Sequence, residues 1–377
     1  MTLTPRENLR RVLRGETPAW VPFAPNLWQW FDHHKANGTL PEEIRDCENQ
    51  YAVHHRLGND IFSRNFDGGY RELNTKVTPE IIREETPLGW RDMIIDPTPH
   101  GALRKVIHYQ TRLTTSHTDE YPVKDWGTDG AAFRYWLDQR ELAWDEAPFL
   151  SAVERIGESG LANLPLGCTP LKFLHHQFGL DGACLFIADN PADAKAVCDT
   201  YWAQLRPLLA RAAEHPLVES VILMDNIDTP FYPPDLAREY WAPYVADAAA
   251  IMRARGKYLF VHACGKLARL SPIFAECRVS GLEGISHPPL GDWGPAKAVA
   301  CHDHFVHIGG VSPMEQSLPE PQLRAFLEKY LENCPRHRVI FSTSCNMEIN
   351  TPWENILLIR DIVRQWGGSP QSGTAGV

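Results

Sequence analysis

The sequence lacks an excess of basic residues. It contains 37 lysines and arginines against 47 aspartates and glutamates, which gives a formal net charge of −10 over 377 residues. A protein whose main partner is nucleic acid needs a basic face for the phosphates. We therefore expect no nucleic acid, and instead a small molecule or a protein partner with a complementary surface.

Long apolar runs are also missing. No stretch approaches the ~20 apolar residues that a membrane helix needs. Residues 1–7 are polar and hold no apolar segment of the kind found in signal peptides. These features predict a cytoplasmic protein without membrane insertion, in which the nine cysteines are reduced thiols.

What the chain does have, from residue 160 onward, is a regular alternation of apolar strand-like segments and helical segments. Such alternation predicts a parallel sheet with helical crossovers. With two earlier strands at residues 20–25 and 60–63, the tally is about eight strands, which favours an α/β fold of the (β/α)8 TIM-barrel type. The alternative is an open doubly wound sheet, but the glycine-rich turn that usually follows its first strand is absent. The strands are predicted at residues 161–166, 218–224, 257–261, 281–286, 304–308 and 338–342.

Segments outside this alternation complete the expected architecture. Thr4, Pro5 and Glu7 are typical of a helix start, so the barrel has an N-terminal helical segment. Alternating extended runs at about residues 70–125 predict an antiparallel hairpin insertion. We expect one barrel domain over residues 1–366, with a disordered tail at 367–377.

Three residues predict a metal site at the carboxyl ends of the strands. His262 and Cys264 follow an apolar strand at a spacing of two, so both side chains point the same way. Cys345 ends the last strand, whose end lies on the same rim of a closed barrel. Imidazole and thiolate are preferred zinc ligands, and three protein ligands with one open position describe a catalytic zinc site.

A fourth ligand is left open between Glu283, His287 and water. Glu283 and His287 lie at even spacing on one predicted strand. A mid-strand carboxylate that points into a barrel is costly without a charged partner or a metal, and this favours Glu283.

Further candidates lie at other strand ends. Asp225 and Asn226 are predicted as catalytic residues and Asp228 as a substrate contact, from their position just before the His262 strand. The alternative is that Asp225 and Asp228 merely stabilise turns. Asn26, Trp28 and Asn346 are further candidates for substrate binding.

Several motifs resemble the uroporphyrinogen decarboxylase superfamily, and more closely its zinc-dependent methyltransferases that work with corrinoid proteins. They are residues 5–15, the His262–Gly265 turn with the distant Cys345, and residues 344–355. The resemblance implies a TIM barrel, a Zn²⁺ cofactor and a methylcobamide carried on a partner protein, the methyl-corrinoid protein. It also implies a small methyl acceptor, either tetrahydrofolate or a thiol such as coenzyme M. Because Trp28, Trp30 and Phe31 offer a surface for a flat pterin, tetrahydrofolate is weakly favoured.

Two other functions remain open at this stage. The superfamily's decarboxylases carry an Arg-Gln-Ala-Gly-Arg run near the first strand and need no metal, whereas residues 23–32 here contain no arginine. The sequence therefore departs from the decarboxylase branch, and a metal-independent decarboxylase of a tetrapyrrole-like carboxylate is kept as the first alternative. The second is a non-catalytic binding protein with structural zinc.

Overall fold

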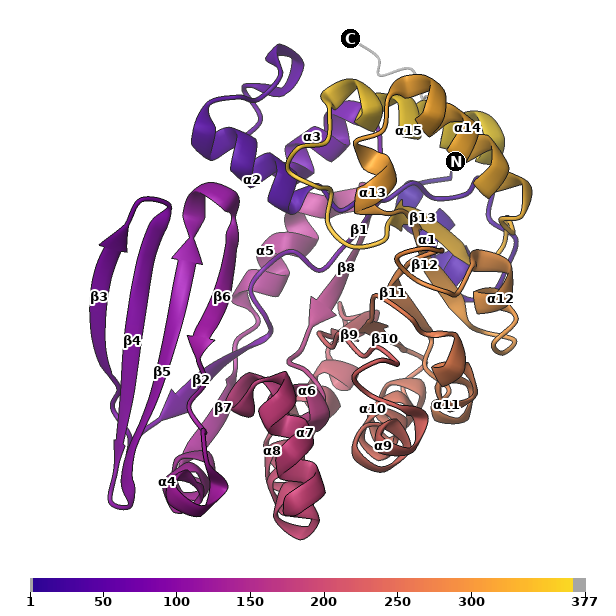
Figure 1. Ribbon diagram of the computed structural model, residues 1–377. Coiled ribbons are helices and arrows are strands. Elements are labelled where there is room, and N and C mark those ends of the chain that lie inside the picture. Colours follow the sequence, from indigo (N-terminus) through magenta and orange to yellow (C-terminus); the bar gives the residue numbers. More distant parts are fainter. Residues whose placement is uncertain (1–2, 369–377) are drawn as a thin grey trace.

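The centre of the protein is a curled parallel sheet with helices between its strands, a TIM-barrel-like α/β fold (Figure 1). The computed structural model describes residues 3–368, and the sheet contains seven strands in the order β1-β8-β9-β10-β11-β12-β13. These strands are β1 (Ile61–Ser63), β8 (Gly160–Pro165), β9 (Ser220–Leu223), β10 (Tyr258–His262), β11 (Gly281–Ile285), β12 (Val306–Val311) and β13 (Val339–Thr343). The predicted fold class is confirmed.

The eighth position of the barrel is filled by a segment that is not a full strand. Residues 20–25, predicted as a strand, form a single parallel bridge between Phe23 and Phe341. On the other side, towards β1, the Asp60 carboxylate accepts hydrogen bonds from the Phe23 N–H and the Trp20 indole, both at 3.0 Å. The strand count of about eight is thus corrected to seven strands and one bridged segment.

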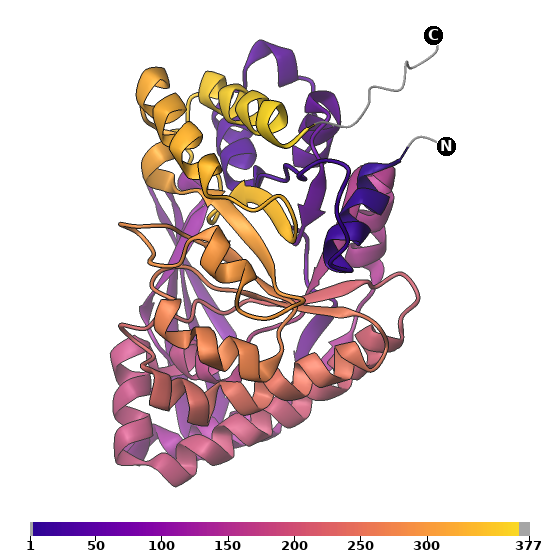
Figure 2. The same ribbon diagram turned by 90° about the vertical axis from the view of Figure 1, so that its right-hand side faces the viewer.

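The helices between the strands cover the outside of the sheet (Figure 2). Two of these helices follow each other directly and are divided at Trp241. None of the helices within residues 3–368 is long and apolar enough to span a membrane. The helices from residue 147 onward are α5 (Ala147–Ile156), η3 (Gly157–Ser159), α6 (Pro170–Phe178), α7 (Leu180–Asp189), α8 (Pro191–Glu214), α9 (Pro234–Tyr240), α10 (Ala242–Arg253), η4 (Ala268–Leu270), α11 (Ser271–Cys277), α12 (Pro295–Val299), α13 (Pro313–Gln316), α14 (Glu320–Glu332) and α15 (Trp353–Gly367).

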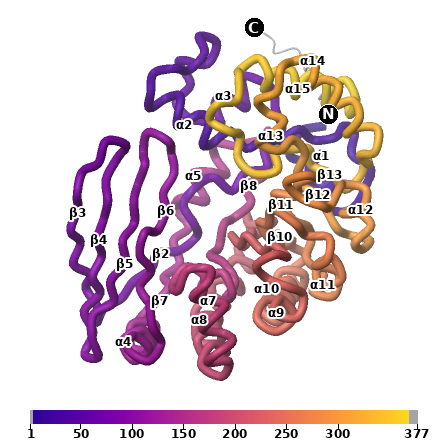
Figure 3. Tube along the Cα trace, in the orientation of Figure 1, coloured from indigo at the N-terminus to yellow at the C-terminus, as the bar shows by residue number. Residues whose placement is uncertain are grey.

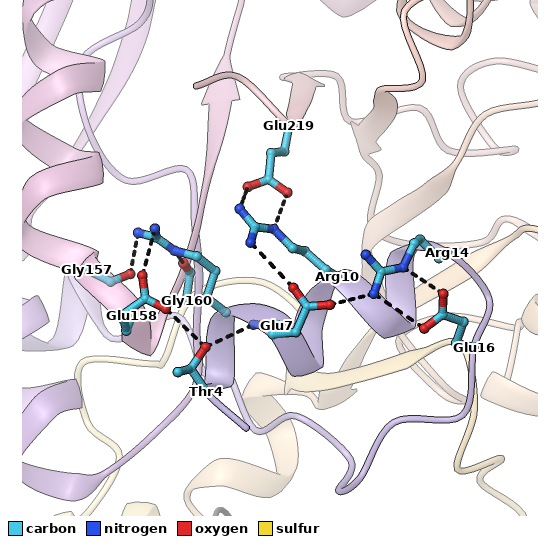
Figure 4. A network of polar contacts seen from close by, with 10 residues as sticks. Thr4, Glu7, Arg10, Arg14, Glu16, Gly157, Glu158, Gly160 and Glu219 are labelled. Carbon is cyan, nitrogen blue, oxygen red and sulfur yellow. Dashed lines mark hydrogen bonds and ion pairs between the residues drawn. The ribbon is translucent and has the colours of Figure 1, made fainter. Parts of the chain in front are cut away.

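The N-terminal helix α1 (Pro5–Leu13) closes the bottom of the barrel, where the strands begin. Its buried residues Leu9 and Val12 share one hydrophobic cluster with the inward-facing strand residues Ile222 and Phe260. Polar contacts fix the helix from outside the core, because the Arg10 guanidinium pairs with Glu219, the residue just before β9, at 2.7 Å (Figure 4). The predicted N-terminal helical segment therefore serves as the floor of the barrel.

The insertion after β1 is larger than the predicted hairpin (Figure 3). It contains a four-stranded antiparallel sheet in the order β3-β4-β5-β6, and a separate ladder of β2 with β7 beyond the predicted boundary. Its elements are β2 (Tyr70–Asn74), β3 (Glu80–Thr86), β4 (Gly89–Thr98), β5 (Gly101–Gln110), η2 (Thr111–Leu113), β6 (Thr115–Glu120), α4 (Trp126–Asp138) and β7 (Arg140–Trp144). Nearly every side chain of β3 is exposed, so the apolar alternation that identifies strands is missing there.

A helical segment lies between the bridged segment and β1. It comprises α2 (Trp28–Asn37), η1 (Glu42–Ile44) and α3 (Gln50–Leu57). On α2, Trp30 and Phe31 are each 1% exposed, and the Trp30 ring stacks on Trp353 at 5.6 Å between centroids. Both residues therefore belong to the core, and only Trp28 of the predicted aromatic surface is exposed, at 38%. Residues 369–377, the greater part of the predicted tail, lie outside the described residues.

Candidate metal centre

His262 lies at the top of the inward-facing row of β10. Residues two apart on a strand face the same side, so His262 follows Phe260, which lies in the barrel's interior cluster. On the neighbouring strand β11, Glu283 is paired in register with His262. Both residues are buried, at 5% and 7% exposure. The parallel register thus brings a histidine and a carboxylate together just inside the mouth of the barrel.

Arg64, the residue after β1, completes a buried trio with these two side chains. Its Nε donates to Glu283 Oε2, and its Nη2 lies 3.4 Å from His262 Nδ1. Glu283 Oε2 is 3.3 Å from the same Nδ1. We call Arg64, Glu283 and His262 the barrel trio. Sequence reasoning expected a partner for the buried carboxylate but did not identify Arg64, whose only signal was its place at a strand end.

Within the barrel trio, neighbouring charges shift the pKa values of Glu283 and His262. Burial alone would raise the pKa of Glu283, but Arg64 and His262 outweigh it and lower that pKa to about 2. For His262, burial and the charge of Arg64 lower the pKa. Glu283, Cys264 and Cys345 raise it by more, so the net pKa lies well above its ordinary value. Without a metal, the stable state is therefore a carboxylate paired with an imidazolium.

The predicted ligand Cys345 lies next to the other ring nitrogen of His262. Its Sγ is 4.0 Å from His262 Nε2, and two donors on one tetrahedral zinc would be about 3.6 Å apart, from Zn–N and Zn–S bonds near 2.0 and 2.3 Å. Burial tends to raise the pKa of the Cys345 thiol, but the neighbouring His262 outweighs this and lowers it. The two side chains are close to the separation that a shared ion requires.

Cys264 is the third predicted ligand, and its thiol lies between His262, whose pKa it raises, and Asn226. Its Sγ donates to Asn226 Oδ1 at 3.8 Å, and the three donor atoms of His262, Cys264 and Cys345 do not all lie within 4.8 Å of one another. Cys264 comes after the end of β10 and is partly exposed.

The turn that carries Cys264 is fixed by Asp228. Asp228 Oδ1 accepts a hydrogen bond from the Lys266 N–H at 2.9 Å. Gly265 has φ +102°, and a Cβ there would lie 2.5 Å from Asp228 Oδ2. Only glycine fits this backbone geometry. Asp228, predicted as a substrate contact, is thus engaged in shaping the turn of a candidate ligand.

The two predicted catalytic residues lie in different surroundings. The Asp225 carboxylate is 1% exposed and accepts hydrogen bonds from the Thr169 N–H at 2.8 Å and the Trp241 indole at 2.6 Å. It joins the start of α6 to the break between α9 and α10, and burial raises its pKa. Asn226 is exposed and faces Cys264. Only Asn226 presents its side chain beside a candidate ligand.

The predicted substrate residues Asn26 and Asn346 contact each other. Asn26 Nδ2 donates to Asn346 Oδ1 at 2.7 Å, and Asn65 Nδ2 donates to Asn26 Oδ1 at the same distance. Asn65 directly follows Arg64. These three amides connect the residues that follow three elements at the mouth of the barrel: the bridged segment, β1 and β13.

The two protein candidates for the fourth ligand, Glu283 and His287, lie in different places. His287 Nε2 lies 3.3 Å from Glu315 on α13, and its ring packs on Phe326 of α14 at 4.8 Å. Glu283 contacts His262 directly, but at Nδ1, whereas Cys345 lies at Nε2. Glu283 is therefore placed to orient the imidazole ring.

A cavity of about 650 Å³ opens beside the barrel trio. Arg64, Asn65, Trp28, Tyr51 and Arg155 are among the residues that line it. Arg64 also contacts Glu283 and His262, so one side chain is shared between the cavity and the barrel trio. Its volume lies in the range of sites that hold drug-sized molecules, about 300–1,000 Å³.

Comparison with known proteins identifies the family. The family model described as uroporphyrinogen decarboxylase (URO-D) matches residues 177–366, half of the chain. The chain belongs to the uroporphyrinogen decarboxylase family. The region matched by this uroporphyrinogen decarboxylase model contains His262, Cys264, Glu283 and Cys345, whereas Arg64 and the antiparallel insertion precede it.

One solved structure supports the fold. A methyltransferase from Methanosarcina mazei aligns with a TM-score of 0.62 at 14% identity, covering 97% of this chain and 99% of that chain, and at this identity the likeness concerns the fold alone. A B12-independent methionine synthase from Shewanella sp. W3-18-1, in complex with selenomethionine, matches at 10% identity with a TM-score of 0.35, covering 93% of this chain and 94% of that chain. No curated protein matches the sequence.

Proposed function

We propose that this protein transfers a methyl group from a methylated corrinoid protein to a small acceptor, with Zn²⁺ held by His262, Cys264 and Cys345. The observation that carries the proposal is the approach of Cys345 Sγ to His262 Nε2, 4.0 Å, at the mouth of the barrel. Cys264 follows on the same strand end. One imidazole and two thiols are a donor set that zinc prefers. As proposed, the reaction takes place in the cytoplasm, where reducing conditions keep both cysteines as thiols.

The residues fit such an ion in their protonation chemistry. A ligating histidine must be neutral, and its other ring nitrogen normally donates to a carboxylate. Glu283 Oε2, 3.3 Å from His262 Nδ1, can accept that hydrogen bond and leave Nε2 free to bind metal. We therefore assign Glu283 an orienting role in place of the predicted ligand role, and the fourth position to water or the acceptor.

The bound ion would supply the acceptor's activation, because zinc makes a thiol a thiolate at neutral pH and polarises other nucleophiles. The protein's own residues would do the positioning. Arg64 keeps Glu283 ionised and fixed, and Glu283 fixes the His262 ring. Asn226, Asn26 and Asn346 offer amide groups at the rim for polar parts of the acceptor.

Tetrahydrofolate is the acceptor that we favour over a small thiol such as coenzyme M. Trp30 and Phe31 are buried and offer no surface to a pterin. The cavity supports tetrahydrofolate, because at about 650 Å³ it is larger than a small thiol needs and is lined by Trp28 and Arg155. An exposed indole can stack on a pterin, and a guanidinium suits the carboxylates of a glutamyl tail.

Two measurements test the proposal. The first is the zinc content of protein purified without a histidine tag, where less than about 0.3 zinc per chain would overturn it. The second follows cob(I)alamin by absorbance when methylcobalamin is offered with tetrahydrofolate or coenzyme M. We expect cob(I)alamin with tetrahydrofolate. Its formation with coenzyme M alone would change the acceptor, and its absence with both would contradict methyl transfer.

A metal-independent decarboxylase is the second candidate, because Arg64 and Arg155 line one cavity and guanidinium groups grip carboxylates. Arg64, however, is already paired with Glu283. Full activity of zinc-free protein on a tetrapyrrole carboxylate would favour this candidate. A binding protein with structural zinc is the third, and it predicts that loss of Cys345 unfolds the chain.

A further inference from the structure

Two histidines and an aspartate lie together on the antiparallel sheet, far along the chain from the barrel ligands. His108 on β5 and His117 on β6 are directly paired across the two strands. Asp119 lies two residues beyond His117, on the same face of the sheet. One ligand atom from each residue lies within 4.8 Å of the others. The rings of the two histidines are 5.0 Å apart between centroids.

The spacing of these donors resembles that of a coordination shell. His117 Nε2 is 2.9 Å from Asp119 Oδ1. Two donors bound to one ion at 2.0–2.2 Å would be roughly 3 to 3.5 Å apart. Histidine and carboxylate ligands together suit zinc and its first-row neighbours better than magnesium or calcium, which prefer oxygen alone.

Neighbouring side chains contact two of these three residues, on the atoms that face away from the proposed ion. Thr86 Oγ1 lies 3.2 Å from His108 Nε2, so that Nδ1 of His108 is left for an ion. Arg91 Nε lies 3.3 Å from Asp119 Oδ2, so that Oδ1 is left. Hydrogen bonds of this kind orient metal ligands in known sites. We call Arg91, Asp119 and His117 the sheet trio.

We propose that His108, His117 and Asp119 bind a divalent first-row transition ion, with Zn²⁺ as the probe, at a site separate from the barrel. Asp119 and His117 are exposed and His108 is partly exposed, so an ion reaches them directly from solvent. Three protein donors leave further positions to water. The site contains no cysteine, which distinguishes it chemically from the barrel ligands.

The ion would connect β5 and β6 near the end of their hairpin. The η2 turn at that end is bonded to α2, because Gln29 Nε2 donates to the Thr114 carbonyl at 3.2 Å and His33 Nδ1 is 2.7 Å from the Arg112 carbonyl. Helix α2 begins at Trp28, which lines the cavity beside the barrel trio. Metal binding on the sheet is therefore expected to slow hydrogen exchange in η2 and at the start of α2.

Equilibrium dialysis of the full chain at about 1 µM free Zn²⁺ tests the proposal. We expect two ions per wild-type chain, and one fewer in His108→Ala and in His117→Ala. His337→Ala, an exposed histidine elsewhere, is the matched control and should bind as the wild type does. A Cys264→Ala/Cys345→Ala variant should keep one ion, and adding His108→Ala should remove it.

The outcomes separate this site from the proposed function. One ion per wild-type chain, lost in the cysteine variant and unaffected by His108→Ala, would overturn the sheet site alone. One ion lost only with His108→Ala would support the sheet site and contradict the barrel zinc. If the cysteine variant does not fold, Co²⁺ spectra of the wild type decide. The barrel site would show thiolate charge-transfer absorption, and His108→Ala should remove one Co²⁺ without weakening that band.

Discussion

Two regions of this protein contain the same three chemical groups in different surroundings. In the barrel trio, an arginine, a carboxylate and a histidine have side chains that are 12%, 10% and 6% exposed. In the sheet trio, the corresponding side chains are 44%, 31% and 50% exposed. In each trio the carboxylate lies within 3.3 Å of both the guanidinium and the imidazole, and the trios differ most in the solvent around them.

The difference in exposure determines how much free energy is lost when a contact is removed. Removing one partner of a buried, hydrogen-bonded ion pair leaves an uncompensated charge and costs about 3–5 kcal/mol. An exposed pair is screened by water and contributes about 0–1 kcal/mol. Breaking the barrel trio is therefore expected to be far more costly than breaking the sheet trio, whose members can rearrange around an ion at little cost.

The largest effect is expected from Cys345→Ala. Cys345 lies beside His262 of the barrel trio, and the sheet trio has no cysteine as a neighbour. We expect the zinc content to fall by about one ion per chain, which leaves the ion of the sheet site, and methyl transfer to fall more than about 100-fold, with a cooperative unfolding transition retained. Metal analysis, the cobalamin assay and thermal unfolding measure these quantities. Cys184→Ala, a partly exposed cysteine on α7, is the control, and an unfolded Cys345→Ala chain would instead indicate structural zinc.

A matched pair of substitutions tests the energetic contrast directly. Arg64→Met should lower the free energy of unfolding of the metal-free protein by about 3 kcal/mol, because Glu283 loses its buried partner. Arg91→Met should lower it by less than about 1 kcal/mol. Urea unfolding of both variants gives the comparison. Equal costs would mean that burial does not distinguish the two trios.

The pH dependence of stability sharpens the contrast further. The folded-state pKa of Glu283 is lowered from 4.5 to about 2, so its charge stabilises the fold above pH 4.5. That stabilisation is lost as the pH falls through this interval. The difference in unfolding free energy between wild type and Glu283→Gln, measured without metal, should therefore shrink between about pH 5 and pH 2. A difference that stays constant over this range would contradict the assignment.

The smallest effect is expected in the sheet. Asp119→Asn keeps the size of the side chain and removes an exposed charge, so the metal-free protein should change in stability by less than about 1 kcal/mol. The same substitution should weaken zinc binding at the sheet site, since a neutral amide is a poorer ligand than a carboxylate. Unfolding without and with Zn²⁺ measures both. A loss well above 1 kcal/mol without metal would mean that the exposed pair behaves like the buried one.

Local sequence patterns predicted most of the barrel. The later strands were placed within a few residues because each is a short apolar run between helical segments, and this also located His262, Cys264 and Cys345 at strand ends. The insertion was underestimated, since β3 exposes almost all its side chains and carries no apolar alternation.

Contacts between residues far apart in the sequence could not be predicted from local patterns. Arg64 and Glu283 are 219 residues apart and meet only because β1 and β11 lie in one curled sheet. His108 and His117 meet because the β5–β6 register pairs them, and that register includes an irregularity at Val106 and Ile107. Trp30 looked like a binding surface because its partner in the core, Trp353, is more than 300 residues away.

The helix at the bottom of the barrel has a consequence for the order of events. With α1 packed into the starting ends of the strands and tied to Glu219, and with Ile222 and Phe260 filling the interior, the lower end of the barrel is closed. A molecule that reacts beside His262 must therefore approach from the opposite end. Under the proposed function, a small acceptor would have to bind before a protein-sized donor covers that end, and its methylated product would leave after the donor.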